Sequence, residues 1–410
     1  MMEKDVIIIG GGPAGLAAAV ELRKKGIEDI LILEREASLG GILRQCIHDG
    51  FGLTRFGETL SGPEYARRFI DEAEALHIPY AVDTMVLHIS PDKTVTAACR
   101  DGLKVWKAKA IMLAMGCRER SRGALGIPGE RPAGVFTAGT AQAYINMYNR
   151  MPGKEVVILG SGDIGMIMAR RMTLEGARVK AVFEIMPYAS GLPRNIQQCL
   201  HDYGIPLYLS HTITEIKGGS RLQGVVVSEV DGHMRPIAGT EKEYSCDTLI
   251  LSVGLIPENE LSEGAGLTLD EQTKGAVVDE HFQTDIPGVF AAGNVLHVHD
   301  LVDFVSMEAE QLADCAASYI RGRALAPCTI RVAAGSGVGN LVPQRLSGTE
   351  AVTLSCRVRS PQRDGTLVVM QNGREAAVHA FKRAVPAEML HIRIAAGALQ
   401  RQGDLEVSMK

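Results

Sequence analysis

The sequence predicts an α/β fold in which one parallel-sheet unit occurs twice, the second copy inserted in the first, followed by a small C-terminal β-rich domain. Three observations predict this architecture. Residues 5–36 resemble residues 155–185, each copy passes from strand to glycine-rich turn to helix to strand, and residues 327–410 contain only short strand-like runs. Strand and helix patterns in this alternation indicate parallel βαβ units.

The two copies are offset by 150 residues, as Gly10 and Gly160 show. Each copy begins with a β-branched strand, turns at glycines into a helix, and enters a second apolar strand. A hairpin turn follows at 101–102 or 231–232, and then a buried strand that ends at Gly116 or Gly254. The other matched pairs are Gly12 and Gly162, Gly15 and Gly165, Gly26 and Gly176, and Glu34 and Glu184.

A third strand–turn–helix pattern covers residues 288–320. No partner strand lies near it in sequence, so we expect it to return to the first copy. In the C-terminal part, turns are expected at Arg363-Asp364-Gly365 and Asn372-Gly373, and the glycine-rich run 335–339 predicts a loop without a ligand because no helix follows it. The predicted domains are 1–120 with 250–326, 121–249, and 327–410.

Composition restricts the function classes. A chain of 410 residues suits two to three domains. The net charge of −5, from 43 basic and 48 acidic side chains, provides no electrostatic case for nucleic acid or an anionic membrane. No apolar run approaches the roughly 18 residues of a membrane span, and a strand from Val6 leaves no room for a signal peptide, so we expect a cytoplasmic protein.

The 8 cysteines are scattered, and no CxxC or CxxxxC pair occurs. This pattern argues against an iron–sulfur cluster, a structural zinc site or a vicinal redox disulfide. We therefore expect reduced thiols that mostly pack in the core.

The glycine pattern of each copy suits a dinucleotide. The first glycine allows a tight turn, the second lets a pyrophosphate approach the backbone, and the third lets helix and strand pack closely. The helix N-terminus favours the pyrophosphate anion, and an acid about 20 residues on hydrogen-bonds the ribose. Glu34 and Glu184 stand at that spacing, so each copy predicts a Rossmann-like site.

The first copy carries features of an FAD site. Gly40-Gly41 and the irregular stretch ILRQCIHDGFGLTRFG would provide a backbone wall for the isoalloxazine ring. The Gly293-Asn294 turn would place a polar side chain at a ribityl hydroxyl, and the helix behind it would point its N-terminus at charge on reduced flavin. The predicted FAD residues are Gly10, Gly12, Pro13, Ala14, Gly15, Glu34, Arg35, Gly41, Ala114, Gly116, Gly293 and Asn294.

The second copy predicts a nicotinamide dinucleotide site that prefers NADH over NADPH. Glu184 ends the second strand of this copy, where a carboxylate accepts ribose hydroxyls and repels a 2′-phosphate. The first cation beyond it is Arg194. The predicted NAD residues are Gly160, Gly162, Asp163, Ile164, Gly165, Glu184 and Gly254.

These motifs resemble the two-dinucleotide flavoprotein superfamily that includes thioredoxin reductase, lipoamide dehydrogenase and NADH oxidases. The resemblance covers residues 1–325 and implies FAD in the first copy and NAD(P)H in the second. The family often has Asp where this chain has Asn294, an exchange that should still let FAD bind. The matching motifs are GGGPAG with Glu34, AMGCRER ending at Arg120, IPG at 127–129, GSGDIG with Glu184, SVGLIPEN at 252–259 and PGVFAAGN at 287–294.

The chain departs from the disulfide-reductase members. Cys46 stands alone after Gly40-Gly41, and GVFTAGTAQAYIN at 134–146 replaces the CxxC segment of thioredoxin reductases. That segment resembles the FAD/NAD subunits of opine oxidase, hydrogen cyanide synthase and sarcosine oxidase. The run GGILRQCIHDGFG resembles stand-alone FAD-dependent oxidoreductases that accompany a glycerol-3-phosphate-dehydrogenase-like flavoprotein. The resemblance implies two partners, the glycerol-3-phosphate-dehydrogenase-like flavoprotein and a small cysteine-rich electron-transfer protein. A homo-oligomer is also compatible with it.

Two residues are catalytic candidates, Cys46 and His48. Cys46 is either a partly buried thiol or a nucleophile near the flavin. His48 lies on the same segment and could donate a proton or hydrogen bond to the flavin, and Arg44 and Gln45 could face the isoalloxazine edge.

His297 and His299 have a spacing that can suit a metal ion. Because no cysteine or carboxylate framework stands near them in sequence, no metal is expected. Trp106 lies in a hairpin strand and is interpreted as a packing residue.

The leading hypothesis is an FAD-dependent oxidoreductase that exchanges hydride with NAD(H) and electrons with a partner dehydrogenase subunit. One alternative is a self-contained NADH oxidase or peroxidase using Cys46, or a small-molecule reductase. A third is a flavin-bearing scaffold subunit, which the intact GSGDIG motif and Glu184 disfavour.

Overall fold

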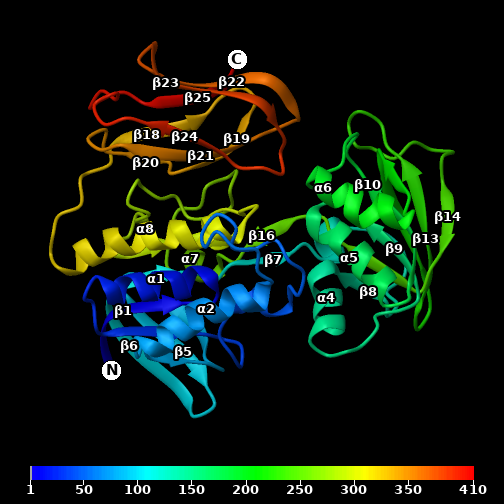
Figure 1. The fold of residues 1–410 in the computed structure, drawn as a ribbon, viewed down its shortest axis with the longest axis horizontal. Helices are drawn as coiled ribbons and strands as arrows, with labels where there is room; N and C mark the ends of the chain where they lie inside the picture. The colour runs from blue at the N-terminus through cyan, green and yellow to red at the C-terminus, as the bar shows by residue number, and fades with distance from the viewer. Residues whose placement is uncertain (1) are drawn as a thin grey trace. The chain divides into compact units, whose positions relative to one another are not determined.

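The computed structural model describes residues 2–410 and divides into two compact units (Figure 1). One unit comprises Met1–Cys117 and Pro257–Lys410, and the other comprises Arg118–Ile256. The two connections between them, β7 (Cys117–Glu119) and β16 (Leu255–Pro257), pair as a two-stranded sheet.

The first unit is built on a sheet of order β3-β2-β1-β6-β5-β4, with β17 beside β6. β1 pairs in parallel with both β2 and β6, and β17 pairs in parallel with β6. The third strand–turn–helix pattern therefore returns to the first copy, as expected. The strands are β1 (Met2–Ile9), β2 (Ile30–Leu33), β3 (Tyr80–Ala81), β4 (Met85–Ile89), β5 (Thr94–Cys99), β6 (Gly102–Leu113) and β17 (Val289–Ala291).

Helices of this unit bury one face of the sheet. α1, α2 and α8 contribute apolar side chains such as Leu16, Phe69 and Leu312 to one core with β1 and β2. A second core lies on the opposite face of the sheet and includes Trp106, which is 4% exposed, as its interpretation as a packing residue requires. The helices are α1 (Pro13–Lys24), α2 (Gly62–Ala75), α7 (Glu260–Gly264) and α8 (Val302–Ile320), with short 3₁₀ turns η1 (Gly41–Gln45) and η4 (Gly293–Val295).

The second unit repeats the arrangement. Its parallel sheet has the order β11-β10-β9-β15-β8, and α5 begins at Asp163, 150 residues after the first residue of α1. The strands are β8 (Val135–Thr137), β9 (Glu155–Leu159), β10 (Arg178–Glu184), β11 (Leu207–Leu209) and β15 (Thr248–Leu251). A separate antiparallel sheet holds β12 (His211–Gly218), β13 (Leu222–Glu229) and β14 (Lys242–Ser245). The helices are α3 (Arg122–Leu125), α4 (Ala138–Asn146), α5 (Asp163–Leu174) and α6 (Pro193–Asn195), with η2 (Ile196–Leu200) and η3 (His201–Tyr203).

Residues 327–410 form strands and contain no helix, as expected. The hairpin at Asn372-Gly373 is confirmed, since Gln371 pairs with Arg374 and both turn residues have positive φ. The expected turn at Arg363-Asp364-Gly365 is wrong. These residues lie inside β22, where Asp364 adopts a φ of 48° without ending the pairing with β23. The strands are β18 (Ile330–Ala334), β19 (Val338–Val342), β20 (Arg345–Leu346), β21 (Val352–Val358), β22 (Gln362–Gln371), β23 (Arg374–Ala384), β24 (Leu390–Ile394) and β25 (Leu405–Met409).

Helix α8 holds the irregular segment that follows η1. The carboxylate of Asp303 is 2% exposed and accepts the backbone N–H groups of Gly52 and Arg55 at 3.1 and 2.7 Å. The Tyr65 hydroxyl donates to Ser306 Oγ at 2.9 Å, which ties α2 to the same helix. The loop after η1 is therefore fixed by buried hydrogen bonds.

Replacing Asp303 should destabilise the fold measurably. Asp303→Ala leaves two backbone N–H groups without acceptors, so we expect the free energy of unfolding to fall by about 1–3 kcal/mol in urea titrations. Asp314→Ala on the same helix is the matched control, because the ion pair of Asp314 with Lys25 is exposed and should contribute little to stability. Equal losses in the two variants would contradict this account of the loop.

Candidate functional site

The glycine turn of the first copy shows which glycines the protein itself requires. A Cβ on Gly10, whose φ is 108°, would lie 2.3 Å from the Ala114 carbonyl oxygen, and one on Gly15 would lie 1.9 Å from the Gly10 carbonyl oxygen. A Cβ on Gly12 would meet no protein atom closer than 3.8 Å. Packing therefore demands the first and third glycines, whereas the space beside Gly12 is open.

The second copy repeats this distinction. A Cβ would lie 2.0 Å from the Ser252 carbonyl oxygen at Gly160 and 2.5 Å from the Gly160 carbonyl oxygen at Gly165. At Gly162 the nearest protein atom, Ser252 Oγ, would be 4.0 Å away. No side chain caps α1 or α5, so in both copies an open glycine adjoins helix N–H groups that suit an anion.

The two acids are held in the same way. Glu34 Oε2 accepts the Gly11 N–H at 2.7 Å, and Glu184 Oε2 accepts the Ser161 N–H at 3.0 Å. The other oxygen of each carboxylate accepts the N–H two residues further on, at 2.8 Å for Glu34 and 3.0 Å for Glu184. Each acid is thereby fixed at the rim of its glycine turn, beside the open glycine.

The second copy adds two hydroxyl groups to its acid. Ser161 Oγ and Ser190 Oγ donate to Glu184 Oε2 at 2.6 and 2.8 Å, while Oε1 accepts the Met186 N–H. Glu184 is 4% exposed, and Arg194 is an exposed residue of α6. The two hydroxyl groups thus occupy one oxygen of the carboxylate, and Oε1 can accept a further hydrogen bond.

The segment after β2 runs back to the first glycine turn. The Gly40 N–H donates to the Gly11 carbonyl at 2.8 Å, and a Cβ on Gly41 would lie 3.0 Å from the Gly12 Cα. Arg44 donates back to the Gly41 carbonyl and to Ser38 Oγ, and Gln45 is buried. The structure thus brings the η1 backbone against the open glycine of the first copy.

Cys46 and His48 differ in their surroundings. Burial raises the pKa of the Cys46 thiol to about 12, and its Sγ donates to the Ile42 carbonyl at 3.4 Å. His48 is half-buried, with Nδ1 3.0 Å from the Asp49 carbonyl oxygen and its ring 5.0 Å from that of Phe51. Cys46 therefore stays a protonated thiol at physiological pH, which removes the usual basis of thiol reactivity.

The Gly293-Asn294 turn also reaches this region. A Cβ on Gly293 would lie 3.0 Å from the Ala14 Cβ, so the turn packs on the first residues of α1. Asn294 Oδ1 accepts the His299 N–H at 3.0 Å and its Nδ2 donates to Cys117 Sγ at 3.6 Å. Three segments far apart in sequence, at residues 10–15, 40–46 and 293–294, therefore meet in one unit.

The remaining predicted residues lie at the edges of the two turns. The Ala114 N–H donates to the Ile9 carbonyl at 2.9 Å, and Gly116 adopts a φ of 73° with open space beside it. The half-exposed Arg35 lies 3.9 Å from Glu258. In the second copy the Gly254 carbonyl accepts the Arg120 N–H at 3.1 Å.

In the structure a carboxylate does lie beside His297 and His299. The expectation that no carboxylate stands near these two histidines is therefore wrong. Glu308 Oε2 lies 2.7 Å from His297 Nε2 and 3.4 Å from His299 Nε2. Glu308 Oε1 accepts the Gly293 N–H at 2.7 Å. Burial opposes ionisation, but the two histidines hold the pKa of Glu308 below its usual range, so an ionised carboxylate fixes the Gly293 turn.

Three of these residues were not predicted from the sequence. Ser161 takes the position of Gly11 in the repeat, so aligning the two copies could have singled it out. Ser190 and Glu308 carry no local signal, because each reaches its partner only through the tertiary fold.

Comparisons with known proteins agree with these sites. Residues 4–318 match the family described as pyridine nucleotide-disulphide oxidoreductase. Thioredoxin reductase of Listeria monocytogenes serovar 1/2a is 29% identical over 303 residues, which cover 71% of this chain and 85% of that protein. The resemblance stated from the motifs is confirmed.

Two further relatives are subunits of other enzymes. Hydrogen cyanide synthase subunit HcnB of Pseudomonas protegens is 27% identical over 325 residues, covering 72% of this chain and 66% of that subunit. One of the opine oxidase subunits of Agrobacterium tumefaciens is 28% identical over 312 residues, covering 71% of this chain and 61% of its own. The match therefore spans less than two thirds of each of these two relatives.

Solved structures share the fold. Thioredoxin reductases of T. acidophilum and Lactococcus lactis each superpose with a TM-score of 0.64 at 25% and 26% identity, covering 78% of this chain and 99% of theirs. A NAD-dependent persulfide reductase from A. fulgidus reaches a TM-score of 0.61 over 90% of this chain and 68% of its own at 21% identity, which is a likeness of fold alone. The predicted fold class is confirmed.

Between residues 2 and 410 no helix is both long and apolar enough to cross a bilayer. The repeated glycine turns with their acids, the family match and the thioredoxin reductase structures lead to one assignment. The chain is an FAD-dependent NAD(P)H oxidoreductase and belongs to the pyridine nucleotide-disulphide oxidoreductase family.

Proposed function

We propose that the chain binds FAD at the Gly10–Gly15 turn and NAD(H) at the Gly160–Gly165 turn, and exchanges electrons with a partner dehydrogenase subunit. The observation that carries the proposal is the pair of open glycines, Gly12 and Gly162, each beside an uncapped helix and a buried acid. A pyrophosphate needs this combination of backbone access and N–H donors.

The contacts of the first copy support FAD there. The η1 backbone and the Gly293 turn pack on the first glycine turn only within this copy, and they supply the extra surface that a flavin ring and ribityl chain need. Asn294 is already engaged by His299 and Cys117, so we assign contact with the ribityl chain to the turn as a whole. Bound FAD would supply hydride acceptance at its ring, and this chain would position and shield that ring.

The thiols support a mechanism without cysteine. None of the 8 cysteines forms a disulfide, and Cys46 is held as a protonated thiol by burial. The self-contained oxidase or peroxidase alternative needs a reactive Cys46 and is therefore disfavoured.

The relatives named as subunits support a partner. HcnB and the opine oxidase relative are each part of a larger enzyme by name. We assign the same arrangement to this chain, with a flavoprotein dehydrogenase of the glycerol-3-phosphate-dehydrogenase type and a small cysteine-rich protein as the proposed partners.

Valine at the two open glycines should separate the two nucleotide sites. Neither Cβ would lie closer than 3.8 Å to a protein atom, so both variants should fold. Gly12→Val should lose FAD, whereas Gly162→Val should keep FAD and lose at least about a hundredfold in its rate of anaerobic reduction by NADH, since a branched side chain would occupy the pyrophosphate position. Flavin spectra and stopped-flow absorbance report the two effects. Full FAD content in Gly12→Val would refute the assignment of the first copy.

Glu184 should set the choice between NADH and NADPH. A 2′-phosphate would meet this buried carboxylate at close range, so we expect wild type to prefer NADH by about ten- to a hundredfold, or about 1.4–2.8 kcal/mol. Glu184→Ala should narrow the gap mainly by faster reduction with NADPH. Arg194→Ala is the control and should leave both rates unchanged. Equal or faster flavin reduction by NADPH in wild type, lost in Arg194→Ala, would mean that the arginine binds the phosphate.

Cys46→Ser should have little effect on flavin reduction. Because the thiol pKa is raised to about 12, no thiolate forms between about pH 6 and 9, and the variant should stay within roughly threefold of wild type across that range. Cys99→Ser, at a half-buried cysteine of β5, is the matched control. A hundredfold loss confined to Cys46→Ser would show that the enzyme needs this sulfur.

A further inference from the structure

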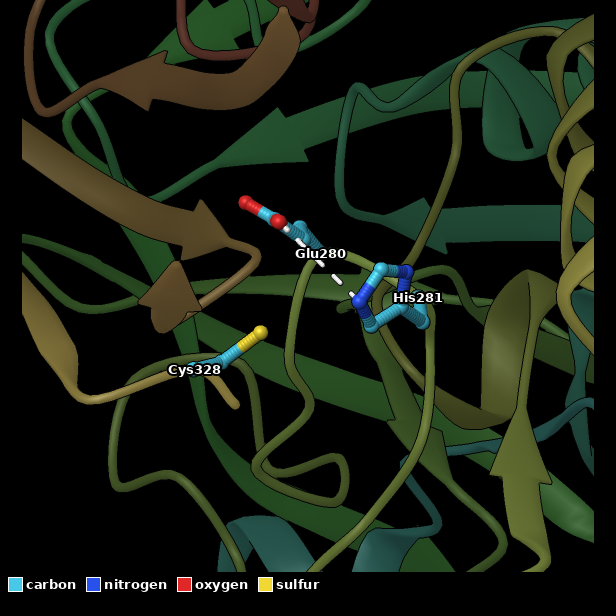
Figure 2. A group of neighbouring side chains, drawn as sticks. All are labelled: Glu280, His281 and Cys328. Atoms are coloured by element: carbon cyan, nitrogen blue, oxygen red, sulfur yellow. Dashed lines mark ion pairs between the residues drawn. The ribbon is translucent and has the colours of Figure 1, made fainter. Parts of the chain in front are cut away.

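A second group of chemically active side chains lies outside both nucleotide sites. Glu280 and His281 stand in the segment before β17, and Cys328 stands in the connection between α8 and β18. One ligand atom of each residue lies within 4.8 Å of those of the others. Figure 2 shows the Cys328 sulfur directed toward the Glu280–His281 pair.

His281 is the residue that points to a missing ligand. Its side chain is 9% exposed, and its Nε2 has no hydrogen-bond partner. That nitrogen lies 4.0 Å from Glu280 Oε1, too far for a hydrogen bond. A buried imidazole nitrogen without a partner is costly, and here it faces a carboxylate and a thiol that can both ligate a cation.

The surroundings orient the three side chains. Glu280 accepts the Ser347 N–H at 3.1 Å and also the Ser347 hydroxyl. The other ring nitrogen of His281, Nδ1, lies 3.9 Å from Cys315 Sγ. No lysine or arginine of residues 2–410 pairs with Glu280. A ligand histidine held through its second nitrogen and a carboxylate held by hydrogen bonds are the usual supports of a metal site.

We propose that Glu280, His281 and Cys328 bind a zinc ion. Imidazole nitrogen, thiolate sulfur and carboxylate oxygen are the donors that Zn²⁺ takes, at bonds of about 2.0–2.3 Å in a tetrahedron, and water completes the fourth position. Such bonds place ligand atoms roughly 3.3–3.8 Å apart, so the 4.0 Å between His281 Nε2 and Glu280 Oε1 needs only a small closure.

The proposed zinc ion would join two parts of one unit. Cys328 precedes β18, the first strand of the C-terminal part, by two residues, while Glu280 and His281 belong to the segment leading to β17. The same two parts already meet at two places. The backbones of Asp279 and Arg345 form an isolated parallel β-bridge, and the Ser347 N–H donates to Glu280. The ion would therefore fix the C-terminal strands to the nucleotide-binding sheet. The scattered cysteines had led us to expect no metal, and the proposed zinc site departs from that expectation.

The group of His297, His299 and Glu308 is the rival location for a metal. In that group one oxygen of Glu308 already accepts the Gly293 N–H, and the other is hydrogen-bonded to His297. His297 Nδ1 there is also buried without a partner, but the carboxylate already pairs directly with both histidines, at 2.7 and 3.4 Å. The group therefore becomes a control in the experiment.

The test is metal analysis of the full-length holoprotein. Wild type, stripped with a chelator and reloaded with Zn²⁺, should hold one zinc per chain by elemental analysis after gel filtration. Cys328→Ser and His281→Gln should each raise the apparent zinc dissociation constant at least about tenfold, while Cys99→Ser and His299→Gln should leave it unchanged. FAD content measured in the same samples shows that each variant is folded.

Cobalt provides the second measurement, and its wild-type spectrum does not depend on whether a variant folds. Co²⁺ added to the stripped wild type should give thiolate-to-metal and tetrahedral d–d absorption, the latter at wavelengths longer than flavin absorbs, and Cys328→Ser should remove the thiolate component. Absence of stoichiometric zinc and of a cobalt spectrum in wild type would overturn the proposal. A cobalt spectrum kept in Cys328→Ser and lost in His299→Gln would also overturn it, by placing the metal at the rival group.

Discussion

The structure depends first on how closely the third glycine of each copy approaches the carbonyl of the first. At Gly15 and Gly165 a Cβ would lie only 1.9 and 2.5 Å from the carbonyl oxygens of Gly10 and Gly160. This contact presses the helix N-terminus onto the turn and leaves the middle glycine facing open space. The acid at the end of the second strand, Glu34 or Glu184, then accepts a hydrogen bond from a backbone N–H of the glycine turn.

Differences between the copies follow from what packs on this shared frame. In the first copy η1 and the Gly293 turn lie against it, and Glu308 holds that turn by its backbone. In the second copy the hydroxyl groups of Ser161 and Ser190 both donate hydrogen bonds to one oxygen of Glu184. Under the proposed function, one scaffold takes a large flavin in the first copy and a nicotinamide nucleotide in the second, and neither site needs a cysteine disulfide.

The sequence predicted the features whose causes are local or repeated. β-branched runs, glycine turns and the hairpin at Asn372-Gly373 depend on the residues that form them. The turn expected at Asp364 failed because strand pairing with β23 tolerates its positive φ. Glu308 beside His297, and Glu280 beside Cys328, could not be found, because folding alone brings these distant residues together.

In the proposed function, flavin is the only redox centre of this chain and is reduced directly by NADH. An anaerobic titration of the purified holoprotein with NADH, followed by flavin absorbance, tests it most directly. We expect complete bleaching at one NADH per FAD, because no cysteine forms a disulfide that could take up further electrons. Uptake of a second equivalent before bleaching is complete, or no bleaching at all, would contradict it.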